Sequence, residues 1–112
     1  MAGTPAEKRA AFGALHESGC FVIPNPWDVG SAIALQALGF KALASTSAGF
    51  AWSRGAPDNR VDRDDVLAHI AELTAAVDIP VNADFEGGFA VEPENVSHRS
   101  GCRVRSGGNH CG

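Results

Sequence analysis

The stretch that decides the fold is "AAVDIPVNADFEGGF", residues 75–89. In it, the short apolar run 81–83 follows Pro80, and Asp84, Glu86 and two glycines come directly after the run. Strands this short and apolar, with no polar alternation, are typical of parallel sheets that are buried on both faces. In such sheets the reactive groups gather on the loops that follow the carboxyl ends of the strands. Residues 84–89 therefore form a candidate functional loop.

The segments before this loop repeat the order helix, then strand. We expect a helix at residues 5–18 that Thr4 caps, a helix between Asp28 and Gly39, and a helix from Asp62 to Asp78, with Asp28 and Asp62 as N-caps. We expect buried strands at residues 20–23, 42–45 and 81–83. This order predicts an α/β fold with a parallel sheet, and the pattern fits a barrel and a doubly wound sheet equally well.

Composition limits the class of protein. A chain of 112 residues with 45% hydrophobic residues is long enough for one domain with a modest core. Its net charge of −4 and its lack of a basic run argue against a nucleic-acid partner. No stretch approaches the roughly 20 apolar residues that span a bilayer, and the first residues lack a signal-peptide pattern. We therefore expect a cytoplasmic protein with no membrane partner and with reduced cysteines, Cys20 being a core residue.

Three residues with side-chain oxygen atoms lie within or just after the expected third strand. Asn82, Asp84 and Glu86 alternate along the chain, so an extended segment would present them on one face. Carboxylate and amide oxygens suit Mg²⁺, which also retains water. These residues are candidate metal ligands, and the alternative is an ordinary solvated acidic turn.

The loop at residues 46–60 offers a second set of groups. Hydroxyls and amides of Ser45, Thr46 and Ser47 at a strand end can bind a carboxylate or phosphoryl group, although ordinary turn chemistry explains them too. Asp58 after Pro57 is equally a turn former. We expect the remaining candidates to be structural: His16 and His69 at the surface or between helices, and Trp27 and Trp52 packed on the pocket rim.

Three stretches taken together resemble one family. They are "NPWDVGSAIALQALGFKALASTSAGFA" from residue 25, "GAPDNRVDRDDVLAHI" from residue 55, and "AAVDIPVNADFEGGF" from residue 75. Their joint occurrence, in order, is similar to the isocitrate lyase and phosphoenolpyruvate mutase superfamily. The resemblance implies a (β/α)8 TIM barrel, of which this chain would hold the N-terminal three strand-helix units.

The resemblance also implies a Mg²⁺ ion and a small oxo- or hydroxy-carboxylate substrate. The cation would neutralise an enolate oxygen while a C–C or C–P bond forms or breaks beside it. Asp84 matches the second carboxylate of the family's metal motif and would contact metal and substrate, while Asn82 stands where the first Asp is expected. Glu86 would compensate as a ligand, and Asp58 matches a catalytic Asp. The substrate carboxylate would be held by Ser45, Thr46, Ser47 and Ala48.

The last residues do not continue the pattern. Residues 97–112, "SHRSGCRVRSGGNHCG", contain Val104 as the one aliphatic residue, a composition that builds no packed helix. We therefore expect a partial barrel domain at residues 1–96 and an aberrant, disordered tail at 97–112, and we hypothesise a change of reading frame near Val96. Sequencing the locus tests this, because a single-base correction should restore an apolar helix and a fourth strand. The tail's zinc-binding alternative uses His98, Cys102, His110 and Cys111, whose spacing matches no established site.

A complete barrel needs about 250 residues, so we expect this chain alone to be inactive while its parent enzyme is a lyase or mutase that commonly forms homo-oligomers. Two rival functions stay open. One is a non-catalytic fragment or binding module that associates with another chain, and the other is a different metal-dependent, enolate-forming barrel aldolase. The residues before Val96 do not choose among C–C lyase, C–P mutase, hydrolase and decarboxylase chemistry.

Overall fold

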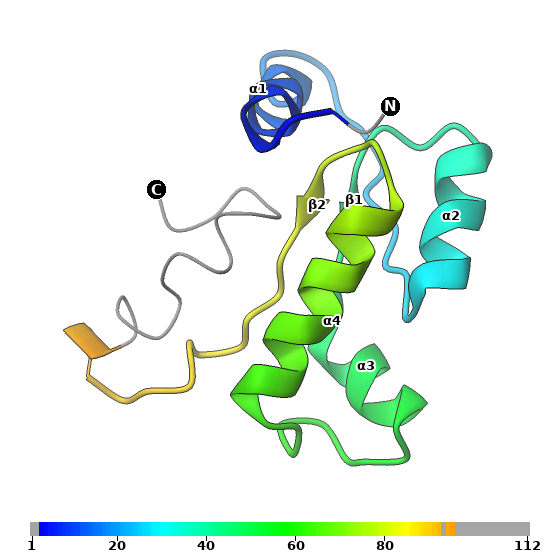
Figure 1. Ribbon diagram of the computed structural model, residues 1–112. Helices are drawn as coiled ribbons and strands as arrows, with labels where there is room; N and C mark the ends of the chain where they lie inside the picture. The colour runs from blue at the N-terminus through cyan, green and yellow to red at the C-terminus, as the bar shows by residue number, and fades with distance from the viewer. Residues whose placement is uncertain (1–2, 93, 96–112) are drawn as a thin grey trace.

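A computed structural model describes residues 3–92 and 94–95 of the chain. In this part each strand follows two helices along the chain, and the two strands lie at the centre with helices around them (Figure 1). In chain order the elements are α1 (Pro5–Leu15), α2 (Val29–Ala37), β1 (Leu43–Ala44), α3 (Ser47–Ser53), α4 (Arg63–Ala76) and β2 (Val81–Asn82).

The two strands form a parallel sheet. Leu43 pairs with Val81 and Ala44 with Asn82, and a backbone hydrogen bond of 2.9 Å from the Ser45 amide to the Asn82 carbonyl extends the ladder. Parallel neighbours need a long crossover connection, which α3 and α4 supply here. The predicted parallel α/β arrangement is confirmed, and the carboxyl ends of both strands lie at the same edge.

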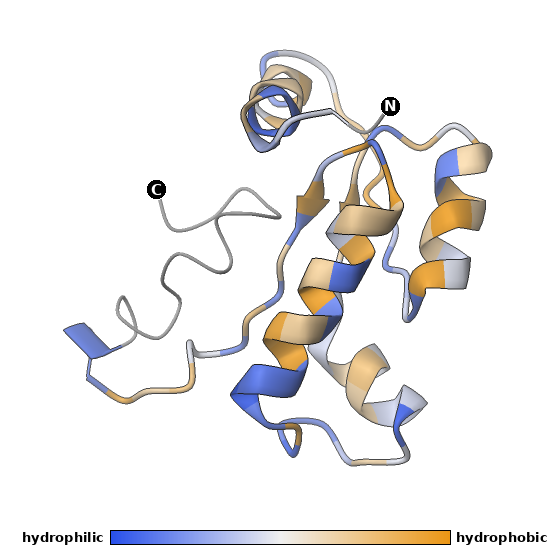
Figure 2. Ribbon diagram, in the orientation of Figure 1, coloured by the Kyte–Doolittle hydropathy of each residue, from blue (hydrophilic) through white to orange (hydrophobic). Residues whose placement is uncertain are grey.

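The core lies between α4, α2 and the sheet. One buried cluster joins Ala32 of α2 to the strand residues Leu43 and Val81 and to Leu73 and Val77 at the end of α4. A second cluster joins Phe50 of α3 to Val66 and Ile70 of α4. The apolar face predicted for α4 is therefore confirmed, and Figure 2 shows how this face gives way to a hydrophilic first turn.

Two of the three helix starts follow the sequence prediction. Thr4 and Glu7 form a reciprocal capping box at α1, and Asp28 and Ser31 form one at α2. Asp62 precedes α4 as predicted, but its side chain makes no capping hydrogen bond. The acidic residues that follow it in the first turn of α4 still favour the positive end of the helix dipole.

Residues 20–23 are not a strand, which corrects the first strand prediction. One backbone hydrogen bond of 3.0 Å, from the Ala44 amide to the Pro24 carbonyl, joins the following residues to β1. Pro24 and Pro26 carry no amide hydrogen, so this segment cannot build a regular ladder with its neighbour. Cys20 is exposed rather than buried, and Val22 is 68% exposed.

Two further differences concern helix lengths. α1 ends at Leu15 rather than at residue 18, and the predicted loop 46–60 contains the helix α3. The hydroxyl of Thr46 accepts a hydrogen bond from the Gly49 amide at 3.1 Å and so caps α3. Within residues 3–92 and 94–95, no helix is both long and apolar enough to cross a membrane.

Candidate functional site

The carboxyl ends of β1 and β2 are joined through Asp84. Its Oδ2 accepts hydrogen bonds from the Ser47 amide at 3.0 Å and from the Ser47 hydroxyl at 2.9 Å, and its Oδ1 accepts one from the Glu86 amide at 3.1 Å. In the reverse direction, the Asp84 amide donates to the Ser45 Oγ at 2.8 Å. The two loops that the sequence singled out, nearly 40 residues apart, therefore meet at one carboxylate.

Asp84 is held in its ionised form. Partial burial by itself would raise the pKa of Asp84, but hydrogen bonds from the amides of Ser47 and Glu86 and from the Ser47 hydroxyl outweigh it and keep that pKa below the ordinary value. The residue is nevertheless exposed at the strand ends. An anchored, solvent-accessible carboxylate is suited to bind a cation.

Glu86 and Asp58 share the electrostatic environment of Asp84. Burial raises the pKa of Glu86, and the negative charges of Asp58 and Asp84 raise it further. The backbone of Glu86 has a positive φ of 50°, so the extended alternation that was expected to place Asn82, Asp84 and Glu86 on one face ends before Glu86. Asn82 is half-buried at the end of β2. Like charges therefore converge at this edge, although not as a regular strand face.

A metal site would use few protein ligands here. Among the described residues, no group of three or more His, Cys, Asp or Glu side chains is arranged to hold a metal ion. Mg²⁺ commonly takes one or two carboxylates and completes its shell with water and substrate oxygens. Asp84 suits this mode of coordination, because a carboxylate oxygen can accept more than one hydrogen bond or metal contact. The ligand set of Asp84, Asn82 and Glu86 stays a prediction.

The residues predicted to bind the substrate carboxylate are engaged with the protein itself. Ser45 is 5% exposed and accepts from the Asp84 amide, Thr46 caps α3, and Ser47 donates twice to Asp84. Ala48 is half-buried in the first turn of α3. These contacts bring Ser45 and Ser47 to Asp84, and the role of the four residues in substrate binding stays a prediction.

A tryptophan pair closes one side of α3. The rings of Trp27 and Trp52 meet edge to face with centroids 5.7 Å apart, and the side chains are 44% and 57% exposed. Gly49 is buried so closely against Trp27 that a methyl group in its place would overlap the indole ring and the Cγ2 of Thr46. Gly49 lies in the stretch where ordinary turn chemistry was the alternative, and Thr46, a favoured N-cap residue, is the signal in the sequence that marks the start of α3.

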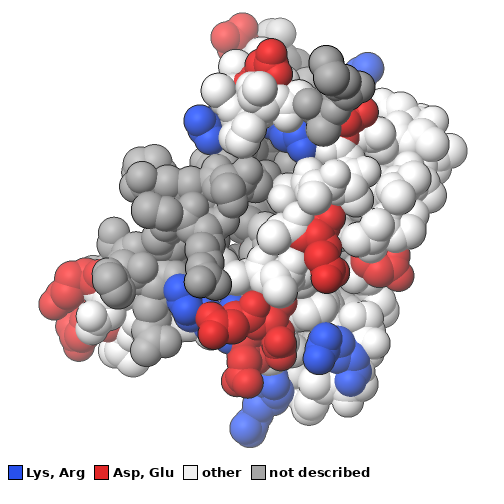
Figure 3. Space-filling view, viewed as in Figure 1, with Lys and Arg blue, Asp and Glu red and all other residues white. Residues whose placement is uncertain are grey.

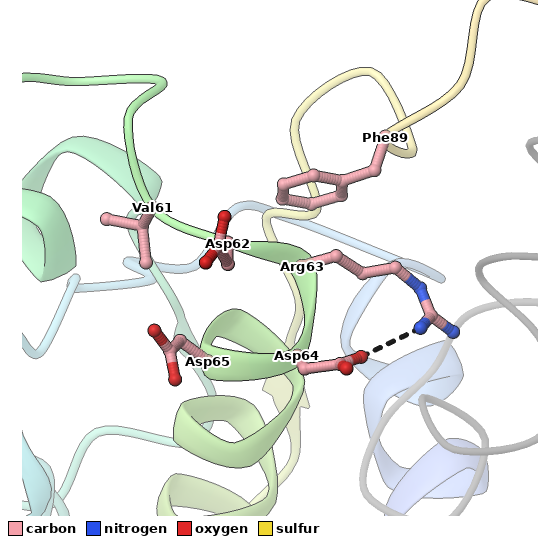
Figure 4. Close-up of a pocket in the computed structure, with 6 residues that line it drawn as sticks. All are labelled: Val61, Asp62, Arg63, Asp64, Asp65 and Phe89. Carbon is pink, nitrogen blue, oxygen red and sulfur yellow. Dashed lines mark hydrogen bonds and ion pairs between the residues drawn. The ribbon is translucent and has the colours of Figure 1, made fainter.

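A separate hollow lies at the start of α4. Its volume is about 480 Å³, and Figure 4 shows the six residues that line it: Val61, Asp62, Arg63, Asp64, Asp65 and Phe89. Arg63 pairs with Asp64 at 2.8 Å. Figure 3 shows acidic side chains gathered over this first turn of α4. None of the residues predicted from the sequence to bind metal or substrate lines this hollow.

The sequence of this chain matches a known family model. Residues 12–104 match the model described as phosphoenolpyruvate phosphomutase. The chain belongs to this family. The match includes Asp58, Asp84 and both loops at the strand ends, and the resemblance seen in the sequence is confirmed.

Other proteins are similar to the chain in sequence or in fold. An uncharacterized protein of Mycobacterium tuberculosis is 42% identical over 89 residues, which are 78% of this chain and 34% of the relative. A candidate lyase/mutase of Burkholderia cenocepacia is 50% identical with a TM-score of 0.88, over 93% of this chain and 38% of that structure. An oxaloacetate acetylhydrolase solved with the inhibitor 3,3-difluorooxalacetate is 28% identical with a TM-score of 0.78, over 95% and 36%. The chain thus spans a little over a third of the length of these relatives.

Proposed function

We propose that the protein to which this sequence belongs is a Mg²⁺-dependent lyase or phosphonomutase-like enzyme, which makes or breaks a C–C or C–P bond beside an α-oxo-carboxylate. The observation that carries the proposal is the ionised Asp84 carboxylate, which Ser47 and Glu86 hold at the joined ends of two parallel strands. In parallel α/β enzymes this edge is where substrates bind. Membership of the phosphoenolpyruvate phosphomutase family supports the same class of reaction.

The fold supports the proposal at the level of architecture. The parallel pair β1 and β2 with its helices belongs, in our proposal, to the first three strand-helix units of a (β/α)8 barrel, with residues 20–23 occupying the place of the first strand. The high TM-score to the Burkholderia structure supports this placement. The boundary predicted near residue 96 and the tail 97–112, including the frame-change and zinc hypotheses, lie outside the described residues.

Asp84 would be the principal ligand of the cation, with Asn82 and Glu86 as further donors. Mg²⁺ bound there would supply Lewis-acid stabilisation of the negative charge that develops on the substrate's oxo oxygen. The donors on Asp84 fix its orientation before the cation arrives, so little reorganisation is needed. In this proposal Ser47 orients the Asp84 carboxylate through its two hydrogen bonds.

The other predicted residues have roles that follow from their positions. Asp58 is exposed, and its Oδ1 accepts a hydrogen bond from the Asn59 amide at 2.9 Å, which leaves Oδ2 available for a water or substrate proton. Ser45, Thr46, Ser47 and Ala48 would bind the substrate carboxylate. The oxaloacetate acetylhydrolase bound to its product oxalate, 28% identical to this chain, supports a small dicarboxylate as ligand. We also propose a cytoplasmic location.

A binding experiment tests the proposal without requiring turnover. Calorimetric titration of the 112-residue chain with Mg²⁺ and then with oxalate should show metal binding that oxalate strengthens. Asp84→Asn should weaken Mg²⁺ binding by at least about tenfold, because one carboxylate ligand becomes neutral. Asp78→Asn, at the opposite end of β2, is the matched control and should bind like the wild type. Equal binding by wild type and Asp84→Asn would refute the assignment of Asp84.

A second candidate function is a non-catalytic module that works by association with another chain. It is favoured by large apolar side chains on the surface, since Val22, Leu38 and Val91 are 68%, 75% and 94% exposed. Light scattering after size exclusion tests it. A stable dimer or larger assembly that binds no Mg²⁺ favours this candidate, and Mg²⁺ binding lost in Asp84→Asn favours the enzyme. Homo-oligomers of the full-length enzyme are part of the first proposal, and light scattering of that longer protein would measure them.

A further inference from the structure

His69 joins α4 to α3 through a buried ring stack. Its side chain is 7% exposed, and its imidazole lies on the ring of Phe50 with centroids 3.9 Å apart and planes 10° from parallel. Among the described residues, the Nε2 atom of His69 is buried without a hydrogen-bond partner. A buried ring nitrogen without a partner is tolerated far better on a neutral imidazole than on an imidazolium, because a buried charge needs a partner.

The stack holds the helix that positions Asp84. Phe50 lies one turn after Ser47, and α3 is only seven residues long. Ser47 is the residue that donates twice to the Asp84 carboxylate. A change in the contact between Phe50 and His69 therefore reaches Asp84 through one short helix.

The charged groups around His69 act in both directions. Burial lowers the pKa of His69 and is the largest effect, while the carboxylates of Glu72 and Asp28 oppose it. Glu72 lies on the same helix, and Asp28 is the N-cap of α2, where its carboxylate accepts from the amide and hydroxyl of Ser31. At the C-cap of α3, the guanidinium of Arg54 lies 5.7 Å from the centre of the Phe50 ring.

We propose that His69 is a proton-sensitive joint: the neutral imidazole holds α3 against α4, and a proton on this ring releases α3 and with it the contact of Ser47 to Asp84. The step is a simple proton uptake from water. The protonated ring carries two N–H donors and a positive charge in a buried place, and the Nε2 donor lacks an acceptor there. A cation–π attraction to Phe50 is a smaller effect, and this ring already faces the cation of Arg54.

The direction of the pH effect follows from linkage. Above the ordinary imidazole pKa of about 6.5 the ring is neutral in both forms, and the closed joint is fully stable. Because the closed form has the lower pKa, each unit of pH below that value shifts the equilibrium by up to about tenfold toward the released form, until the pKa of the closed form is passed. The device is independent of metal and substrate, so it can be tested apart from the proposed function.

The chain carries its own reporter of this movement. Trp27 and Trp52 are its two tryptophans, and Trp52 belongs to α3 while Trp27 precedes α2. Their edge-to-face contact gives a near-ultraviolet circular dichroism signal that depends on the position of α3. The 112-residue chain should lose this signal between pH 7.5 and 5, while far-ultraviolet dichroism retains the helical content of α4.

Three variants decide the matter. His69→Phe keeps an aromatic ring against Phe50 but takes up no proton, and it should hold the tryptophan signal constant over this pH range. Phe50→Leu removes the stack and should show the low-pH signal at every pH. The matched control His16→Gln removes an exposed imidazole and should keep the wild-type transition. A constant wild-type signal, the same transition in His69→Phe, or an imidazole of His69 that titrates at its ordinary pKa by NMR would each overturn the proposal.

Discussion

The two ends of the small sheet are built in opposite ways. At the amino ends of the strands, the buried Lys8 of α1 donates to the carbonyls of Thr74 and Val77 at 2.8 and 2.7 Å, and so caps the end of α4. The Gln36 Oε1 accepts from the Asp78 amide at 2.6 Å in the connection to β2. Figure 1 shows α1 beside this end of α4. Helix-end carbonyls and free amides are thus satisfied by groups of complementary polarity.

At the carboxyl ends, like charges converge instead. Asp84 is ionised, and the pKa of Glu86 is raised first by burial and then by the charges of Asp58 and Asp84. A protein that only maximised stability would separate these charges. Local rules are broken mainly where function requires it, so the difference between the two ends supports our proposal that the carboxyl-end edge is functional and the amino-end edge structural.

Lys8→Met should have the largest effect on stability. The substitution keeps an apolar stem but leaves the Thr74 and Val77 carbonyls without their charged donor, and we expect a loss of about 3 kcal/mol in the free energy of unfolding. Urea denaturation measures it. Lys41→Met, at an exposed lysine, is the control and should change stability little. If both variants lose the same amount, the amino-end edge is not the structural one.

Gly49→Ala should have the next largest effect and acts at the other end. The added methyl group overlaps the Trp27 indole and the Thr46 side chain, so we expect a loss of about 2 kcal/mol from overpacking. Gly30→Ala, inside α2, is the matched control: the added methyl group would lie 3.7 Å from the Asp28 Oδ1, an ordinary contact, and the change should be neutral or stabilising because alanine favours helix. A stable Gly49→Ala chain with an unchanged tryptophan signal would contradict the close packing of α3.

Much of the fold follows from local sequence signals. Apolar spacing and capping residues predicted α2 and α4, and the two short apolar runs around Leu43 and Val81 predicted the parallel pair. The prediction of a strand at residues 20–23 was wrong. It rested on apolar composition alone, which does not take into account the missing amide hydrogens of Pro24 and Pro26 or the availability of a partner strand. The helix α3 was missed because a turn-rich stretch such as "TSAGFAWS" becomes helical through the tertiary contacts of Phe50 and Gly49.

The candidate site was predictable only in part. Spacing after a strand identified Asp84, and chain order placed the loop of Ser45 and Ser47 at the same edge. The direction of their hydrogen bonds was not predictable, since it depends on the parallel register of two strands nearly 40 residues apart. The buried stack of His69 on Phe50 depends on the same long-range packing.

Asn82→Asp would increase the difference in charge between the carboxyl-end and amino-end edges of the sheet. It places a carboxylate at the first position of the proposed metal motif, and we expect about tenfold tighter Mg²⁺ binding, because added ligand charge raises affinity for hard cations. Without Mg²⁺ the extra negative charge should slightly destabilise the fold. Calorimetry measures the affinity, and Asn95→Asp adds the same charge outside the motif as a control. Equal tightening in both variants would indicate a general charge effect rather than a ligand at residue 82.

Glu86→Gln should have the smallest effect. The pKa of Glu86 is raised by burial and then by Asp58 and Asp84, so its ionised form costs stability in the fold. Because the side chain is partly exposed, solvent screening limits the gain from removing the charge to under about 0.5 kcal/mol at pH 7.

The pH dependence separates this charge effect from ordinary packing. An acid with a raised pKa in the fold costs stability above that pKa, and the cost fades as pH falls toward its unfolded value, about 4.3. The stability gained by Glu86→Gln over wild type should therefore shrink from pH 7 to pH 4.5, and the contribution of His69 cancels in this difference. Adding Asp58→Asn should yield less than the sum of the two single gains, because both remove the same repulsion. Strictly additive gains, or a gain that is independent of pH, would show that the carboxyl-end edge does not concentrate charge.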